Sequence, residues 1–332
     1  MLGKHKSQNG TRTGLTLLVS VVVLSLLLTA CGGAKPKTYT IGVVSESIPL
    51  EVVVNGFKAG MTELGYVEGK NVTYIYHGAV GPDSQKNDAE FKSLMGQKVD
   101  LLLALGTMPP VAAKKAVEGT GTPVVFAPVR NPVEAGIVAS IRHPGGNVTG
   151  IQTINTTPKA LEWLLKVAPG TKQVHVPYNP ADPAVLTTIQ SLSDAAPKLG
   201  VELVAHEVSS GEEELAAIRA LPKDSAILFI VSQSLTPSLK DASQLAAELR
   251  IPTGADRISA TGDTVLFRLQ TDLPRAGKQA AGLADKIFKG TKPGDLPVET
   301  AESSLSINLK TAQAIGLNVP DEILRQVDNV IR

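Results

Sequence analysis

Short runs of β-branched and aliphatic residues recur along this chain at nearly regular intervals, and their spacing restricts the possible fold more than any other feature. Each interval, roughly 24 to 33 residues, has room for one strand, one helix and two short loops. The series therefore predicts a parallel sheet with right-handed βαβ crossovers. The expected strands of this first series are Tyr39–Val44, Val72–Tyr76, Asp100–Ala104, Val124–Ala127 and Val148–Ile151.

A second series of the same kind begins near residue 173. Its expected strands are Gln173–Tyr178, Glu202–Glu207, Ala226–Val231, Ile251–Gly254 and Val265–Leu269. Open sheets of ten or more strands are uncommon, and 332 residues suggest about two domains, so two sheets are more plausible than one. The predicted fold class is α/β, with two doubly wound parallel-sheet (Rossmann-like) lobes, the first at residues 38–150 and the second at residues 151–270.

The residues between the first two expected strands have the period of a helix packed on a sheet. Val53, Phe57, Met61 and Leu64 lie at i, i+4, i+8 and i+11 and form one apolar stripe. Aromatic residues make up only 4% of a chain that is 43% hydrophobic, so we expect a core filled mainly by aliphatic side chains.

Charge and reactive side chains exclude several classes of function. The 32 basic and 31 acidic residues nearly balance, which provides no broad basic surface for nucleic acid. A single cysteine excludes an intramolecular disulfide and multi-thiolate metal sites, and no pair among the five histidines has metal-ligand spacing. Since a Gly-x-Ser-x-Gly elbow and a Walker loop are also missing, we expect neither a metal, nor a cofactor, nor an enzymatic reaction.

The first thirty residues have the pattern of an export signal. Lys4, Lys6 and Arg12 precede an apolar run over Leu15–Leu28, which at about 21 Å is shorter than the roughly 30 Å core of a bilayer. The following Leu-Thr-Ala-Cys-Gly resembles the lipobox of bacterial lipoproteins, in which the cysteine is acylated. We therefore predict a lipoprotein signal peptide at residues 1–30, a lipidated tether at residues 31–37 and acyl (palmitate) chains on Cys31; the alternative is a free thiol after a transmembrane anchor.

Several longer strings of this chain match the pattern of a known family. They are Phe57–Met61, Glu63–Val72, Asn131–Gly136, Pro144–Gly150 and Ile307–Ala312, followed by Ile315–Leu317 and Pro320. Over about residues 40 to 331 the chain resembles the bacterial ABC-transporter substrate-binding proteins that include tryptophan and tyrosine binders. The resemblance implies a type I periplasmic-binding fold, whose two lobes are joined by a hinge that the chain crosses more than once. It implies that a helix within residues 271–296 returns to the first lobe and that the tail, residues 297–332, returns to the second.

Loops that follow the strands at their carboxyl ends are the expected ligand contacts, because these ends meet at one edge of each parallel sheet. The candidate ligand-binding residues are Ser45, Gly106, Thr107, Arg130, Asn131, Tyr178, Asn179, Ser232, Gln233, Asp256 and Arg257.

The resemblance and the side chains at these positions limit the ligand. The resemblance implies acids in amino-acid-binding relatives where this chain has Asn131 and Gln233, and an amide does not neutralise a buried ammonium. An α-amino acid is therefore disfavoured. Arg130, Arg257 and Arg268 would suit a negatively charged or carbonyl-rich solute, although arginines at loop ends are also commonly just solvated.

Two loops have further signs of ligand contact. Gly106 and Thr107 precede a proline pair at a helix start, where free N–H groups can face an anion. In the second lobe Tyr178 could stack on a ligand, and Asp182 is expected to cap the helix that begins at Pro183. The usual roles of proline and asparagine in turns and at helix ends explain these residues equally well.

These observations predict a monomeric solute-binding lipoprotein, anchored to the outer face of a membrane by lipid on Cys31. It would capture a small molecule between its lobes and deliver it to an ABC permease and its ATPase. The alternatives are a lipoprotein sensor that reports ligand to a membrane signalling receptor, and an extracytoplasmic enzyme on the same scaffold, for which no nucleophile and base are evident.

Overall fold

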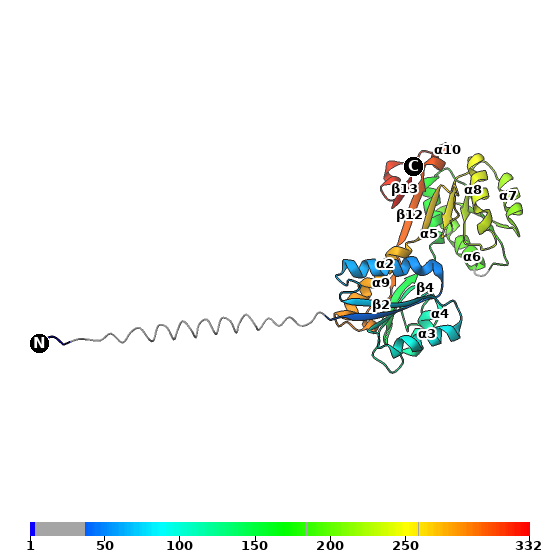
Figure 1. Ribbon diagram of the computed structural model, residues 1–332. Helices are drawn as coiled ribbons and strands as arrows, with labels where there is room; N and C mark the ends of the chain where they lie inside the picture. The colour runs from blue at the N-terminus through cyan, green and yellow to red at the C-terminus, as the bar shows by residue number, and fades with distance from the viewer. Residues whose placement is uncertain (4–36, 183–184, 258) are drawn as a thin grey trace.

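The computed structural model describes residues 1–3, 37–182, 185–257 and 259–332, and all of these except residues 1–3 belong to two lobes joined by several chain crossings (Figure 1). Residues 4–30 of the expected signal peptide, Cys31 and all of the tether except Lys37 lie outside the described residues. Within the part of the chain that the structure describes, every helix is too short or too polar to cross a bilayer.

The first lobe is built on a six-stranded sheet in the order β11-β5-β4-β3-β1-β2, in which all neighbouring strands are parallel. Its strands are β1 (Tyr39–Ser45), β2 (Val72–Ala79), β3 (Leu101–Leu105), β4 (Val124–Arg130), β5 (Val148–Thr153) and β11 (Glu299–Thr300). The five strands expected from the first series of apolar runs are thus present within a few residues of the predicted bounds.

The second lobe is built on a seven-stranded sheet in the order β13-β12-β10-β9-β8-β6-β7. Its strands are β6 (Gln173–Tyr178), β7 (Glu202–Glu207), β8 (Ser225–Phe229), β9 (Thr253–Asp256), β10 (Phe267–Thr271), β12 (Ser303–Asn308) and β13 (Asn329–Ile331). Strand β12 runs antiparallel to β10, with Thr271 opposite Ser303, because the chain leaves this lobe after β10 and re-enters beside it. The α/β class with two parallel-dominated sheets is confirmed.

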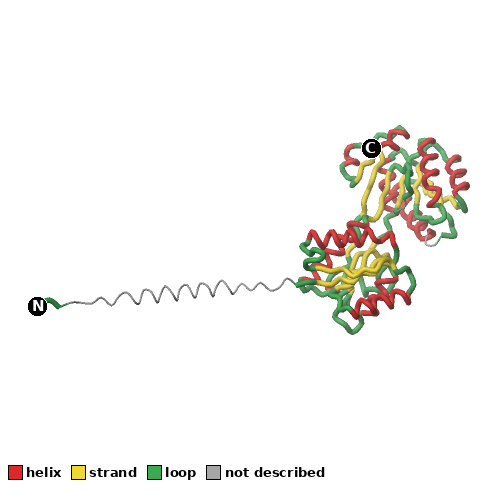
Figure 2. Tube along the Cα trace, viewed as in Figure 1, coloured by secondary structure: helices red, strands yellow, loops and turns green. Residues whose placement is uncertain are grey.

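Helices cover both faces of each sheet (Figure 2). In the first lobe α2 (Glu51–Glu63) and α9 (Leu273–Phe288) lie on one face, and α3 (Ser84–Gly96) and α4 (Met108–Ala116) on the other. In the second lobe α5 (Thr157–Val167), α6 (Val185–Ala195) and α10 (Leu309–Ala314) lie opposite α7 (Gly211–Arg219) and α8 (Leu239–Glu248). The remaining short helices are η1 (Ile48–Leu50), η2 (Ala196–Leu199), η3 (Thr236–Ser238), η4 (Pro293–Asp295) and α11 (Asp321–Leu324).

The stripe expected over residues 53–64 is largely that of α2. Val53, Phe57 and Met61 are fully buried against the sheet. Leu64, expected to join them, is 43% exposed because it is the C-cap residue, where the helix ends and the stripe loses its period.

The chain crosses between the sheets after β5, after β10 and again after β11. Helix α9 packs on α2 of the first lobe, and β11 still pairs with β5. The last crossing therefore lies at residues 301–302, after Thr300, rather than at the boundary after residue 296 that the sequence suggested.

Helices α2 and α9 approach each other closely at two glycines. A Cβ atom at Gly277 would lie 2.2 Å from the carbonyl oxygen of Val53, and one at Gly56 would lie 2.1 Å from the carbonyl oxygen of Pro274. These neighbours are backbone atoms, so a side chain at either position would have to push one helix away from the other.

We predict that Gly277→Ala lowers the free energy of unfolding by about 1 to 3 kcal/mol, because overpacking shifts the backbone. The matched control is Gly282→Ala in the same helix, where a Cβ meets nothing within 4 Å. That change should stabilise the protein by about 0.5 to 1 kcal/mol, through helix propensity. Urea unfolding of the two variants makes the comparison; an unchanged midpoint for Gly277→Ala would contradict the close approach.

Candidate functional site

The carboxyl ends of both sheets lie at the junction between the lobes. Strand β5 ends at Thr153 shortly before α5 of the second lobe, and β10 ends at Thr271 shortly before α9 of the first lobe. Since all parallel strands of a sheet end at the same edge, the loops after them also face this junction. The ordering β2-β1-β3-β4-β5 and its counterpart β7-β6-β8-β9-β10 reverse direction between β1 and β3 and between β6 and β8. Crevices for ligands form at such switch points.

The switch point of the first lobe is occupied by the chain's own Glu46. Its Oε2 atom accepts a hydrogen bond from the N–H of Thr107 at 2.6 Å, at the N-terminus of α4. Gly106 has φ +95°, and a Cβ there would lie 2.2 Å from Glu46 Oε2, so both the turn and the carboxylate require glycine. The Thr107 N–H that was expected to be free for a ligand is therefore bound by a protein carboxylate. Ser45 is fully buried and donates to the carbonyl of Ser47.

The switch point of the second lobe repeats this arrangement with Asp182. Its Oδ2 atom accepts from the hydroxyl of Ser232 and from both the N–H (3.3 Å) and the hydroxyl (2.9 Å) of Ser234. The Ser232 bond, followed by those from Ser234, lowers the pKa of the Asp182 carboxyl, while burial opposes the shift. Ser232 also accepts from the N–H of Asn179 at 3.3 Å. Asp182 was expected to cap a helix beginning at Pro183, and residues 183–184 lie outside the described residues.

A buried carboxylate organises the hinge. Asp256, at the end of β9, is fully buried and accepts from the hydroxyls of Thr156 (2.6 Å, to Oδ1) and Thr157. The Nε atom of Arg257 donates to Asp256 Oδ2 at 2.9 Å, and its Nη2 donates to Thr157 at 3.2 Å. Thr156 and Thr157 stand where the chain enters the second lobe, so Asp256 ties this crossing to the sheet edge and fixes the Arg257 guanidinium.

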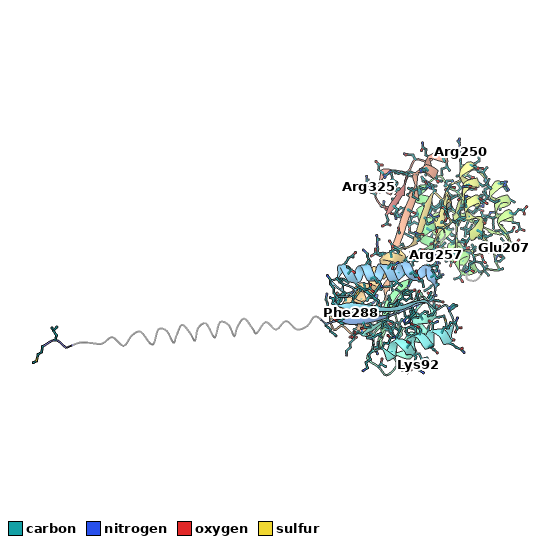
Figure 3. The ribbon with its side chains drawn as sticks, viewed as in Figure 1. Lys92, Glu207, Arg250, Arg257, Phe288 and Arg325 are labelled. Carbon is teal, nitrogen blue, oxygen red and sulfur yellow. The ribbon has the colours of Figure 1, made fainter. Side chains whose placement is uncertain are left out.

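Arg130 brings a second cation to the same place from the first lobe. It is the last residue of β4 and pairs in register with Thr153, the last residue of β5. Burial and then the charge of Arg257 lower the pKa of Arg130, and Asp256 partly offsets this. Figure 3 labels Arg257 where the two lobes meet. The structure thus places Arg130 and the Asp256–Arg257 pair, which the sequence put on two separate loops, at the same crossing between the lobes.

Other expected contacts are placed differently. Tyr178 is 6% exposed within the core of the second lobe, and its hydroxyl donates to Glu207 at 2.8 Å. Burial, followed by this bond, raises the pKa of Tyr178. The aromatic ring is therefore not available to stack on a ligand, and this prediction is wrong. Arg268 lies within β10 and forms an ion pair with Asp263, both of whose carboxylate oxygens accept from it at 2.7 Å.

The two amide positions remain at the junction edge. Asn131 has φ +53°, and its Nδ2 donates to Glu134 at 3.0 Å. Gln233 is exposed between Ser232 and Ser234. The side-chain oxygen of Asn179 is bonded within its own loop, because Oδ1 accepts from the N–H of Ala181 at 2.9 Å.

Glu46 and Asp182 are site residues that sequence reasoning did not select. A signal existed in retrospect: each acid closely follows a central strand, and the neighbouring strand is followed by Gly-Thr or Ser-x-Ser. Only the sheet order shows that these two loops are neighbours.

The first lobe also has a cavity away from this junction. It has a volume of about 760 Å³ and lies at the opposite edge of the lobe, between the end of α4 and the residues before β5. Among the described residues, no group of three or more His, Cys, Asp or Glu side chains is placed to hold a metal ion.

Nearly the whole chain is similar to known proteins. Residues 40–331 match the profile of a family described as ABC transporter substrate binding protein. A tyrosine-binding protein of Clostridioides difficile (strain R20291) is 30% identical over 287 residues, covering 85% of this chain and 82% of that protein.

Two solved structures share the fold. The ligand-free, open structure of a substrate-binding protein with adhesive properties from Clostridium difficile has a TM-score of 0.76 at 24% identity, covering 89% of this chain and 99% of the other. An ABC domain in complex with L-Trp from Streptococcus pneumoniae has a TM-score of 0.62 at 22% identity, covering 89% and 100%. Both have the type I periplasmic-binding fold, which the sequence strings had also indicated.

Proposed function

The chain belongs to the ABC transporter substrate-binding protein family, and from this membership we propose that it closes its two lobes over a small solute and delivers that solute to an ABC-type membrane permease. The proposal is supported above all by two cations that the hinge receives from different lobes. Arg130 pairs in register with Thr153, and Arg257 donates to Thr157, four residues later in the same crossing. A solute that contacts both would bind the closed form more tightly than the open form, and this difference in affinity drives closure.

Closure by this route is energetically reasonable. If about 1% of the protein is closed without solute, reversing the ratio to 99:1 requires about 5.5 kcal/mol of differential binding. A few hydrogen bonds to charged groups, at about 1.5 to 3 kcal/mol each, supply that amount.

The test combines native mass spectrometry with small-angle scattering. Spectra of the purified protein identify any solute that co-purifies, and defined pools of amino acids, sugars and carboxylic acids serve as added probes. A bound solute should decrease the radius of gyration and, at 100 times its Kd, stabilise the protein by about 2.7 kcal/mol. A solute that stabilises the protein without compacting it would contradict lobe closure.

We further propose that the mature protein is an extracytoplasmic lipoprotein, processed before Cys31 and held on the membrane by acyl chains on that residue. Stable attachment needs more than one chain, which a triacylated cysteine would provide. A monomer on the outer face of a membrane could receive solute and present it to a permease and its ATPase. Family membership favours this transport role over the sensor and the enzyme considered above.

A further inference from the structure

The cations at the hinge are not balanced by the acid beside them. Arg130 ends β4 of the first lobe in register with Thr153, and Arg257 of the second lobe donates to Thr157, four residues further along the same crossing. Asp256 is the carboxylate bonded to Arg257, so the three groups together carry one net positive charge. Two guanidinium groups that approach each other repel, and lobe closure would strengthen this repulsion unless an anion came between them.

Hydrogen bonds within the protein fix the orientation of the Arg257 guanidinium group. Its Nε and Nη2 atoms are bonded to Asp256 and Thr157, and its side chain is only 13% exposed. The backbone of Arg257 is in the left-handed region, at φ +57°. Bonds on these two nitrogens orient the planar group, so that little further conformational entropy is lost when it binds a carboxylate.

The N–H groups at the two switch points are already bound. Thr107 N–H donates to Glu46 and Ser234 N–H donates to Asp182, at the two places where a helix or turn would otherwise receive an anion. A negatively charged solute must therefore find its counter-charge elsewhere at the junction, and the arginine pair provides it.

The remaining side chains suit an apolar solute that lacks a cation, because the carboxylates of Glu46 and Asp182 at this edge are already bonded within the protein. Asn131 and Gln233 offer amides, which do not compensate an ammonium in a desolvated site. Large apolar side chains in the loops and first helical turns that follow strands at this edge are each more than 40% exposed, although such residues are commonly buried. They are Ile48, Val52 and Val133 in the first lobe and Leu186 and Val231 in the second.

We propose that the solute is a carboxylic acid with an apolar body and no required α-ammonium, whose carboxylate bridges Arg130 and Arg257 when the lobes close. This proposal rests on the proposed function and names the substrate class of the same site. Each guanidinium can donate two parallel hydrogen bonds to a carboxylate, which favours this anion over a neutral carbonyl.

The test uses pairs of compounds that differ in one group. L-Tyrosine is compared with 3-(4-hydroxyphenyl)propionate, which lacks the ammonium, and with tyramine, which lacks the carboxylate; L-tryptophan is compared with indole-3-propionate. By isothermal titration calorimetry, each acid should bind at least tenfold more tightly than its amino acid, and tyramine should not bind.

A matched pair of variants locates the binding site. Arg130→Gln removes one of the two guanidinium groups and should weaken binding of the acids at least tenfold. The Arg130 side chain is exposed, so this change should not disturb the core. Arg142→Gln removes the same charge from an exposed position before β5, at the opposite edge of the sheet, and should leave the Kd unchanged. Thermal unfolding of both variants checks that they remain folded.

The outcomes separate the two proposals. Amino acids that bind tenfold more tightly than their desamino partners, acids that do not bind, or an Arg130→Gln variant with unchanged affinity would each overturn the carboxylate proposal. If some other solute then compacts the protein, the solute-capture function still stands. Acids that bind through Arg130 without compaction would support the carboxylate site and count against lobe closure.

Discussion

Replacing Asp256 by alanine is expected to lower the free energy of unfolding by about 3 to 5 kcal/mol, the usual loss when one partner of a buried ion pair is removed. Asp256 is fully buried and accepts from Thr156, Thr157 and Arg257. Without the carboxylate these donors lose their partner, and the guanidinium remains largely buried with an uncompensated charge. Chemical denaturation followed by circular dichroism measures the loss.

Two controls define the cause. Asp256→Asn keeps the size and an acceptor oxygen, so its loss should be smaller than that of the alanine variant. Asp224→Ala removes an exposed acid of the same lobe, whose partner Lys172 is 78% exposed, and should change stability by no more than about 1 kcal/mol. Equal effects of Asp256→Ala and Asp224→Ala would mean that the hydrogen bonds of Asp256 with Thr156, Thr157 and Arg257 do not stabilise the lobe.

Replacing Cys31 by serine is expected to move the protein entirely from the membrane fraction to the soluble fraction. Serine has no thiol to carry acyl chains, and anchoring by lipid requires more than one chain. The chain has a single cysteine, so no other residue could take its place. Membrane fractionation of expressing bacteria shows the location, and intact mass spectrometry shows whether acyl groups and residues 1–30 are present.

The matched control for this change is Ala34→Ser, which lies a few residues after the cysteine in the tether and should leave anchoring intact. A Cys31→Ser protein that stays in the membrane with the mass of the full chain would support the alternative transmembrane anchor. Removal of the leader without acyl groups on the wild-type protein would equally contradict lipidation.

Much of the fold could be predicted because strand positions depend on local sequence. A run such as Val124–Ala127 is apolar and rich in β-branched residues whatever surrounds it, and its spacing from the next run leaves room for one helix. Errors arose where neighbours in space decided the outcome. Leu64 continues the apolar period of α2 but lies at its exposed end, and β12 is antiparallel because of the path of the chain between lobes.

The candidate site was predicted as a set of loops and not as a set of contacts. Arg130 and the neighbouring residues Asp256 and Arg257 were selected for their positions after strands, yet nothing local indicates that Arg130 lies at the same crossing as the other two. Tyr178 was selected by the same reasoning and is instead buried against Glu207. Glu46 and Asp182 were passed over because each needs a partner loop from a neighbouring strand to acquire its role.

The amino-acid sequence by itself determined the alternation of strands and helices, the two-lobe organisation and the position of the single thiol, because periodicity, spacing and composition are properties of neighbouring residues. The tertiary structure alone decided which carboxylates fill the two switch points, which arginines lie at the hinge and which glycines let α2 and α9 approach. These features depend on atoms that are distant in the chain and are brought within a few ångströms only by the order of the strands and the crossings between lobes.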